Sequence, residues 1–147
     1  MKTDLVVAGF IFDNDKVLLI HHKKLNMWLP PGGHIDKDET PDEALLREIK
    51  EELGIDVEIL NKNELQVEGK IKKQLATPIY ANVHDVGNHD HCCLFYLCQL
   101  KNNTINVNKN ELNDFKWFSI EDLTKDIISS AVRNQALKAF EILEKLR

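Results

Sequence analysis

The chain has few cysteines, no long apolar run and no repeat, and each shortage excludes a class of protein. Three cysteines among 147 residues, without a signal peptide, indicate reduced thiols rather than a disulfide-stabilised secreted fold. No apolar run approaches the roughly 18 residues of a membrane span, and no low-complexity linker is present. We therefore expect a cytoplasmic protein that binds no membrane and folds as a single domain over residues 1–147.

The acidic excess of the chain is concentrated in one segment. The net charge is −5, from 19 Lys and Arg against 24 Asp and Glu. Residues 33–55 hold eight of the acids and three of the bases, so this segment accounts for the whole excess and the remainder is balanced. A local acidic excess disfavours stable nucleic-acid binding and favours cations as partners. A solvated helix face is the alternative for such a charge run.

The same segment contains both ends of a helix. Thr40 is a suitable N-cap, Glu43 three residues later completes a capping box, and Pro41 suits the first helical position. Gly54 can adopt the left-handed conformation that ends a helix. These signals predict a helix over residues 41–53.

Helical geometry groups the carboxylates of this segment. At 100° per residue, Glu48, Glu51 and Glu52 fall within an arc of about 100°. An apolar edge lies beside them, made of Leu45, Ile49 and Leu53. Arg47 precedes Glu51 by one turn, where an ion pair could orient that carboxylate and leave the other two for a metal. An ordinary surface ion pair is the alternative for Arg47.

A rigid glycine-containing loop leads into the helix. Two prolines are followed by paired glycines that let the backbone approach a ligand closely, over residues 30–33. Together the loop and the helix match a spaced motif in full, consisting of Gly33, Glu39, Arg47, Glu48, Ile49, Glu51, Glu52, Gly54 and Ile55. This motif resembles the Nudix box. The lead-in from Trp28 and the later segment 117–123 are also similar to that family, so the likeness covers most of the chain.

The resemblance implies a fold and an activity. The expected fold is α+β, an α/β/α sandwich around a central mixed β-sheet. The expected reaction is hydrolysis of a pyrophosphate bond in a nucleoside diphosphate linked to another group, such as a nucleoside triphosphate, a nucleotide sugar or a dinucleoside polyphosphate. Mg²⁺ or Mn²⁺ is the implied cofactor, which agrees with the preference of hard cations for oxygen ligands. The chain could also form a homodimer.

The resemblance also implies roles for individual residues. Glu48 and Glu52 correspond to the principal metal ligands, Glu51 to a second ligand or an anchor of metal-bound water, and Gly32 to a carbonyl ligand. Glu39 corresponds to an outer carboxylate, and Arg47 corresponds to the orienting partner. The catalytic base is Glu48 or Glu111, and Glu111 is equally well explained as surface charge.

Apolar runs predict the remaining elements. Leu5–Phe12 and Lys16–Ile20 form a hairpin through the polar turn 13–15. Further strands are expected at Ile55–Leu60, Gln66–Lys72, Ile79–Val83, Cys92–Leu100 and Phe115–Phe118. Ser119 can begin a short helix that ends at Leu123. A longer helix is expected from Asp126, with an apolar face of Ile127, Ala131, Ala136, Leu137, Phe140, Leu143 and Leu146.

Histidines and lysines outside the motif are candidate substrate contacts. The basic run at the end of the second strand could bind phosphates through His21, His22 and Lys23. We also expect a substrate-side loop that carries His84, His89 and His91. Trp28 is among the aromatic residues that could stack on a base, with Phe10, Tyr80, Phe95 and Tyr96.

Two other functions compete with hydrolysis. A nucleotide or nucleotide-sugar sensor on the same fold would bind without cleaving, but every carboxylate of the motif is retained. A zinc or redox protein could use the histidines with Cys92, Cys93 and Cys98. No Cys-x-x-Cys pair occurs, and adjacent cysteines of a strand point to opposite faces, so we interpret them as core residues.

Overall fold

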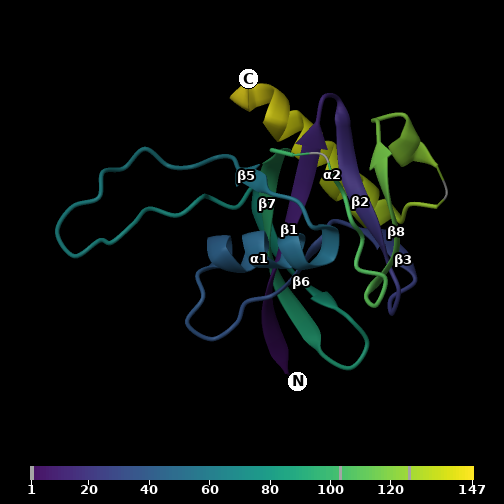
Figure 1. Ribbon diagram of the computed structural model, residues 1–147, viewed down its shortest axis with the longest axis horizontal. Coiled ribbons are helices and arrows are strands. Elements are labelled where there is room, and N and C mark those ends of the chain that lie inside the picture. The colour runs from purple at the N-terminus through teal and green to yellow at the C-terminus, as the bar shows by residue number, and fades with distance from the viewer. Residues whose placement is uncertain (1, 103, 126) are drawn as a thin grey trace.

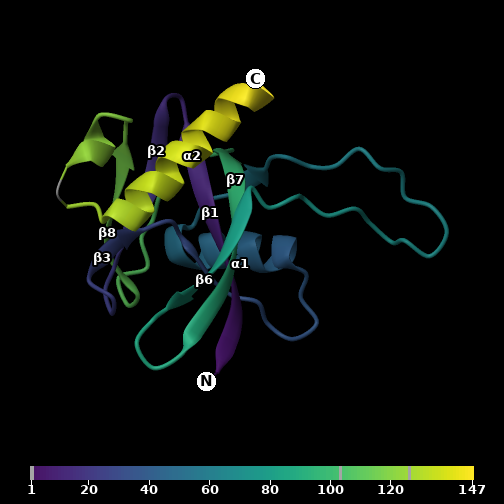
Figure 2. The ribbon, with the colours of Figure 1, turned by 180° about the vertical axis from the view of Figure 1, so that it is seen from behind.

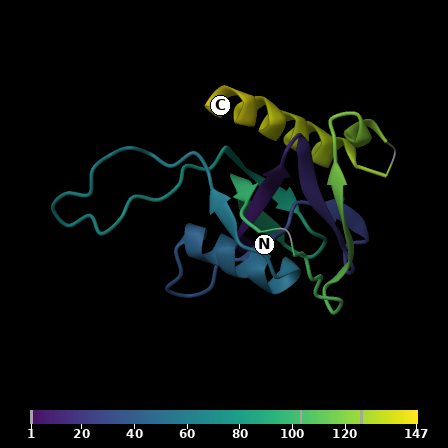
Figure 3. The same cartoon turned by 45° about the horizontal axis from the view of Figure 1, so that its top comes forward.

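The protein is a mixed β-sheet with one helix on each face. The computed structural model describes residues 2–102, 104–125 and 127–147. In Figure 3, α2 (Ser130–Leu146) lies above the sheet and α1 (Pro41–Leu53) lies below it. This confirms the expected α+β sandwich. The strands are β1 (Thr3–Asp13), β2 (Lys16–His22), β3 (Met27–Leu29), β4 (Gly32–His34), β5 (Val57–Ile59), β6 (Tyr80–Asp85), β7 (Asp90–Leu100) and β8 (Leu112–Phe118).

Strands β1 and β2 lie side by side in the sheet (Figure 1) but separate along part of their length, and the glycine loop pairs with β1 there. β1 pairs in parallel with β7 along one edge, but with β2 only from Ile11 to Asp13. Beyond that point β4 pairs with β1, and β3 pairs with β2. Residues 30–31 therefore connect the two halves of the sheet and place Gly32 and Gly33 opposite Ala8 and Val7.

Alternate residues of β1 contribute to two cores, because neighbouring side chains of a strand point to opposite faces. Val6, Phe10 and Phe12 belong to the core under α2. Val7 and Ile11 belong to the core against α1. The same alternation makes Cys93 and Cys98 buried core residues on opposite faces, as the sequence predicts, whereas Cys92 is only half-buried. Burial raises the pKa of the Cys93 thiol to about 12.

Helix α1 begins and ends where the sequence predicts. The Thr40 hydroxyl accepts a hydrogen bond of 3.2 Å from the Glu43 N–H, and the Glu43 carboxylate accepts one of 3.0 Å from the Thr40 N–H. Gly54 has φ 68° and donates its N–H to the Lys50 carbonyl at 2.9 Å. Both ends are therefore stabilised by residues within one or two turns, which fixes the rotation of the carboxylates.

One predicted strand is wrong. Residues Gln66–Lys72 are not a strand but lie in an arm between β5 and β6 that projects from the domain (Figures 1 and 2). Leu65, Val67 and Ile71 are exposed there. One isolated β-bridge between Lys62 and Ala76 and a few further hydrogen bonds join the two sides of the arm. Strand propensity without a partner strand or a buried face does not form a ladder.

The C-terminal elements differ in detail from the prediction. Asp126, the predicted first residue of the last helix, lies outside the described residues, and α2 begins at Ser130 with Ser129 as its N-cap. Its buried positions are Val132, Ala136, Ala139 and Leu143, whereas Ile127, Ala131 and Leu146 are exposed. The buried face of α2 is therefore rotated relative to the predicted face, because Val132 rather than Ala131 packs on the sheet. The predicted helix from Ser119 is a single 3₁₀ turn, Asp122–Thr124.

Within the described residues, no helix has both the length and the hydropathy needed to cross a membrane.

Candidate active site

The three carboxylates of α1 lie beside β4 and differ in exposure. The Glu51 side chain is 51% exposed and that of Glu48 is 15% exposed. Glu52 is buried, with 4% of its surface exposed. The apolar edge of α1 packs against the sheet, so the predicted acidic edge follows the border of the core and reaches into it at Glu52.

Glu52 is the most perturbed of these groups. Its Oε1 accepts a hydrogen bond of 3.0 Å from the Gly32 N–H. Burial nevertheless raises the pKa of Glu52 to about 8. The negative charges of Glu48, Glu111 and Glu51 contribute to this rise. A carboxylate in this environment is stabilised when a cation joins it.

Gly33 allows Glu48 to lie against β4. A Cβ atom built on Gly33 would be 2.3 Å from the Glu48 carboxyl carbon and 2.5 and 2.6 Å from its oxygens. Any side chain at residue 33 would therefore displace this carboxylate. Burial raises the pKa of Glu48, while Arg47 lowers it.

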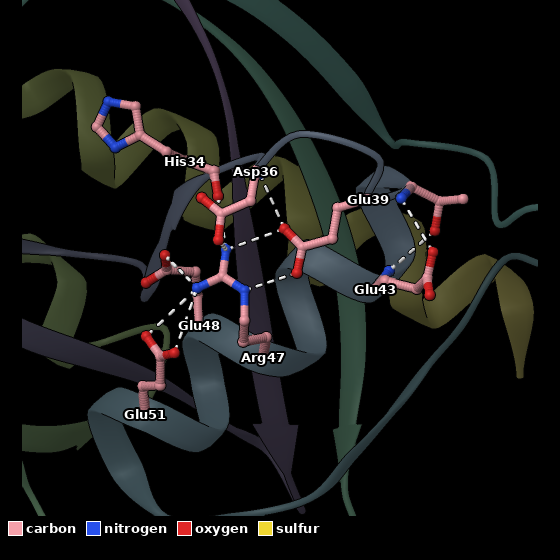
Figure 4. Close-up of polar contacts among 8 residues, drawn as sticks. His34, Asp36, Glu39, Glu43, Arg47, Glu48 and Glu51 are labelled. Carbon is pink, nitrogen blue, oxygen red and sulfur yellow. Dashed lines mark hydrogen bonds and ion pairs between the residues drawn. The ribbon is translucent and has the colours of Figure 1, made fainter.

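Arg47 holds several acidic groups in place (Figure 4). Its Nε and Nη2 donate to the two Glu39 oxygens at 2.6 and 3.0 Å, and Nη1 donates to Glu48 at 3.0 Å. The distance from Nη1 to Glu51 is longer, 3.3 Å. The predicted pairing of Arg47 with Glu51 is thus a secondary contact, because the bidentate geometry of the guanidinium is taken by Glu39. These hydrogen bonds raise the pKa of Arg47.

We expect Arg47→Lys to lower kcat/KM by roughly 10- to 100-fold, the usual cost of losing a group that orients metal ligands. An ammonium cannot reproduce the fork that joins Glu39 to Glu48. The measurement is kcat/KM with Mn²⁺, next to Arg147→Lys at the chain terminus as a control. A rate close to wild type for Arg47→Lys would show that charge alone suffices.

Glu111 lies on a loop that is attached to the end of α1. The Asn106 and Asn108 N–H groups donate to the Leu53 and Glu52 carbonyls at 2.9 and 2.8 Å. Glu111 follows in a turn, and its charge raises the pKa of both Glu48 and Glu52. The fold therefore brings Glu111 to the side of the molecule that carries the box carboxylates.

The basic run reaches the same loop. The Lys23 N–H donates to the Glu111 carbonyl at 3.1 Å, and the His21 ring contacts the Asn113 amide at 2.9 Å. Trp28 packs edge-on against His21, at 5.2 Å between centroids, and against Phe118. Burial lowers the pKa of His22. Among the other aromatic candidates Phe10, Phe95 and Tyr96 are buried in the cores, while Trp28 and Tyr80 are half-buried.

The predicted histidine loop is largely β-structure. His84 lies on β6 and pairs with His91 on β7, so only His89 lies in the connecting turn. The sheet adds two residues that the sequence reasoning missed, Asp4 and His34, and donor atoms of Asp4, His34 and His91 lie within 4.8 Å of one another. No local signal could reveal this group, because its members come from three strands. Burial and the neighbouring histidines lower the pKa of His91.

The surface has hollows elsewhere. Cavities of about 340 and 590 Å³ lie beside Ile55 and beside Phe140. Neither is lined by a carboxylate of the box, so the candidate site is defined by charge and hydrogen bonding rather than by the depth of a pocket.

Carboxylate oxygens gathered on a helix beside a glycine loop are the ligand type that hard cations prefer. The sequence model of the NUDIX domain matches residues 2–140. The chain belongs to the Nudix family.

Known structures and sequences agree with this assignment. A NUDIX-family hydrolase from Clostridium perfringens is 34% identical and superposes with a TM-score of 0.85, covering 97% of this chain and 99% of that one. An RNA pyrophosphohydrolase of Marinomonas sp. is 39% identical over 46% of this chain and 45% of its own length. An 8-oxo-dGTP diphosphatase of Proteus vulgaris is 42% identical over 35% and 51%. The chain thus spans about half the length of these curated relatives.

Proposed function

We propose that this protein hydrolyses a pyrophosphate bond in a nucleoside diphosphate linked to a second group, with Mg²⁺ or Mn²⁺ held by Glu48, Glu51 and Glu52. The observation that carries the proposal is the burial of Glu52 next to like charges. Isolated buried charge is costly, and an adjacent divalent cation reverses that cost. The donors are all oxygen, which suits a hard cation.

The residues around the carboxylates have distinct tasks in this proposal. Gly32 positions Glu52 through its N–H and could offer its carbonyl to the ion, while Arg47 and Glu39 orient Glu48. A bound ion would lower the pKa of a water molecule and neutralise charge on the leaving phosphate. The proton of that water passes to a carboxylate.

Substrate binding is assigned to the neighbouring basic and aromatic groups. His21, His22 and Lys23, at the end of β2, lie beside the turn that carries Glu111 and would supply donors for phosphate oxygens. Trp28, half-buried beside His21, could stack on a base or a sugar. The similarity to relatives that are named for RNA and for 8-oxo-dGTP supports nucleotide-type substrates.

A product assay tests the proposal. Candidates are a nucleoside triphosphate, 8-oxo-dGTP, a 5′-triphosphorylated RNA, a nucleotide sugar and a dinucleoside polyphosphate, each with Mg²⁺, with Mn²⁺ and with EDTA. We expect metal-dependent release of a phosphate-containing product from at least one of them. Tight binding of a nucleotide without turnover in any metal would instead favour the sensor function.

The proton acceptor is identified by comparing two substitutions. Glu111→Gln and Glu48→Gln should both slow turnover, and the one that removes the base should show the larger loss, about 10²- to 10⁴-fold in kcat. Glu64→Gln, an exposed site on the arm, is the matched control. Turnover of Glu111→Gln equal to that of the control would assign Glu111 to surface charge and leave Glu48 as the base.

A further inference from the structure

We infer that Asp4, His34, His89 and His91 form a second metal site, for a borderline first-row ion such as Zn²⁺. The site is separate from the carboxylates of α1 and does not depend on the hydrolase proposal. It is assembled by strand pairing. Asp4 lies beside His91 in the β1–β7 register, and His34 lies opposite Val6 in the β1–β4 register.

The cluster occupies the sheet face opposite α1. Asp4, Val6, His34, His91 and Cys93 share one face, because Val6 and Cys93 belong to the core under α2. α2 does not cover this end: Figure 2 shows the start of β1 and the β6–β7 hairpin extending below the helix. In Figure 4 the His34 ring points away from Arg47 and the box carboxylates. β4 thus presents Gly33 to one site and the His34 ring to the other.

The donor distances fit a small tetrahedral ion. Asp4 Oδ2 is 3.2 Å from His34 Nε2 and 3.3 Å from His89 Nε2. Ligands about 2.0 Å from a tetrahedral Zn²⁺ are about 3.3 Å apart. The His91 ring lies 5.4 and 5.1 Å from the His34 and His89 rings. One ligand atom of His91 lies within 4.8 Å of those of Asp4 and His34.

A hydrogen bond at one ring nitrogen of His89 orients the other ring nitrogen toward Asp4. His89 Nδ1 lies 2.5 Å from the Asn88 side-chain oxygen and donates to it, so in the neutral ring Nε2, which faces Asp4, is the nitrogen that can bind a metal. The 3.3 Å between this nitrogen and the Asp4 oxygen is also the separation of two ligands on one tetrahedral ion. Such a bond to the second ring nitrogen is the usual way of orienting a metal-binding histidine. His84 has the same arrangement with Asn82, at 2.9 Å, next to the His91 ring.

The ligand chemistry separates the two sites. Imidazole suits Zn²⁺ and its first-row neighbours, whereas carboxylate and carbonyl oxygens suit Mg²⁺ and Mn²⁺. A metal here would also hold β4, whose His34 carbonyl accepts a 2.9 Å hydrogen bond from Arg47.

Zinc binding to the untagged protein tests the inference. We expect about one high-affinity Zn²⁺ per chain in competition with a chromogenic chelator. His91→Ala and Asp4→Asn should each weaken it at least 10-fold. His21→Ala, a histidine outside the cluster, and Glu52→Gln should bind as wild type does. Zinc should raise the melting temperature of wild type and His21→Ala but not of His91→Ala.

Several results would overturn the inference. Wild type could fail to bind zinc, Asp4→Asn and His91→Ala could bind it unchanged, or Glu52→Gln could abolish binding, which would place zinc at the box carboxylates. Thermal melting in EDTA shows whether each variant is folded. If His91→Ala does not fold, the conservative variant Asp4→Asn still tests zinc binding. If wild type is zinc-free and His89→Ala/His91→Ala raises KM in chelated buffer, these histidines contact the substrate directly instead.

Discussion

Glu52→Gln should abolish hydrolysis, with a loss on the order of 10³-fold or more in kcat/KM. The substitution removes the buried negative ligand while keeping an acceptor for the Gly32 N–H. Each factor of ten corresponds to about 1.4 kcal/mol of transition-state stabilisation, and a bound metal contributes several kcal/mol. The assay uses the best substrate of the panel with Mn²⁺. Wild-type turnover by this variant would disprove the metal-site assignment.

The same variant should be more stable than wild type in EDTA at pH 8. The folded-state pKa of Glu52, about 8, lies above the ordinary value of 4.5. Between these pH values the folded protein binds more protons than the unfolded chain, so the free energy of unfolding of metal-free wild type falls as pH rises. Glutamine has no such titration. We expect a melting temperature higher by on the order of 5 °C at pH 8, with the difference shrinking toward pH 5.

Glu58→Gln on β5 is the matched control for this measurement, because Glu58 is exposed. Its melting temperature should follow wild type at both pH values. Added Mn²⁺ should stabilise wild type and Glu58→Gln but not Glu52→Gln. A metal-free Glu52→Gln protein that melts below wild type at pH 8 would contradict the account of a strained buried carboxylate.

Gly33→Ala should cost about 10²-fold or more in kcat/KM while leaving the metal-free melting temperature within a few degrees of wild type. The added methyl would overlap the Glu48 carboxylate, which lies at the end of a flexible side chain and can move away from the site. The fold is then retained and the ligand geometry is lost. Misplacing a reacting group by about 1 Å can cost 10²-fold.

Gly32→Ala provides the contrast. A Cβ at Gly32 would lie 2.0 Å from the Val7 carbonyl oxygen, so backbone rather than a side chain must move and β4 would separate from β1. We expect a clearly lowered melting temperature for Gly32→Ala and not for Gly33→Ala, measured side by side in EDTA. Equal destabilisation of the two variants would assign both glycines to folding alone.

Local rules made the Nudix helix predictable from the sequence. The capping box at Thr40, the left-handed Gly54 and the helical repeat act within one or two turns, so they set the ends and the rotation of α1 without any distant partner. The β1–β2 hairpin was predictable for the same reason, since its turn is short and Asn14 accepts a positive φ. These elements carry the box carboxylates and the strand that supports them.

Only the tertiary structure decided which distant residues meet. Parallel pairing of β1 with β7 and the split between β1 and β2 bring Asp4, His34 and His91 together, although 30 or more residues separate them in the sequence. The same dependence on partners left Gln66–Lys72 without a strand and gave Glu39 the bidentate contact with Arg47. The choice of partner among distant strands is a non-local property: it depends on which edges remain free once the cores are packed, and the residues of one strand do not specify it.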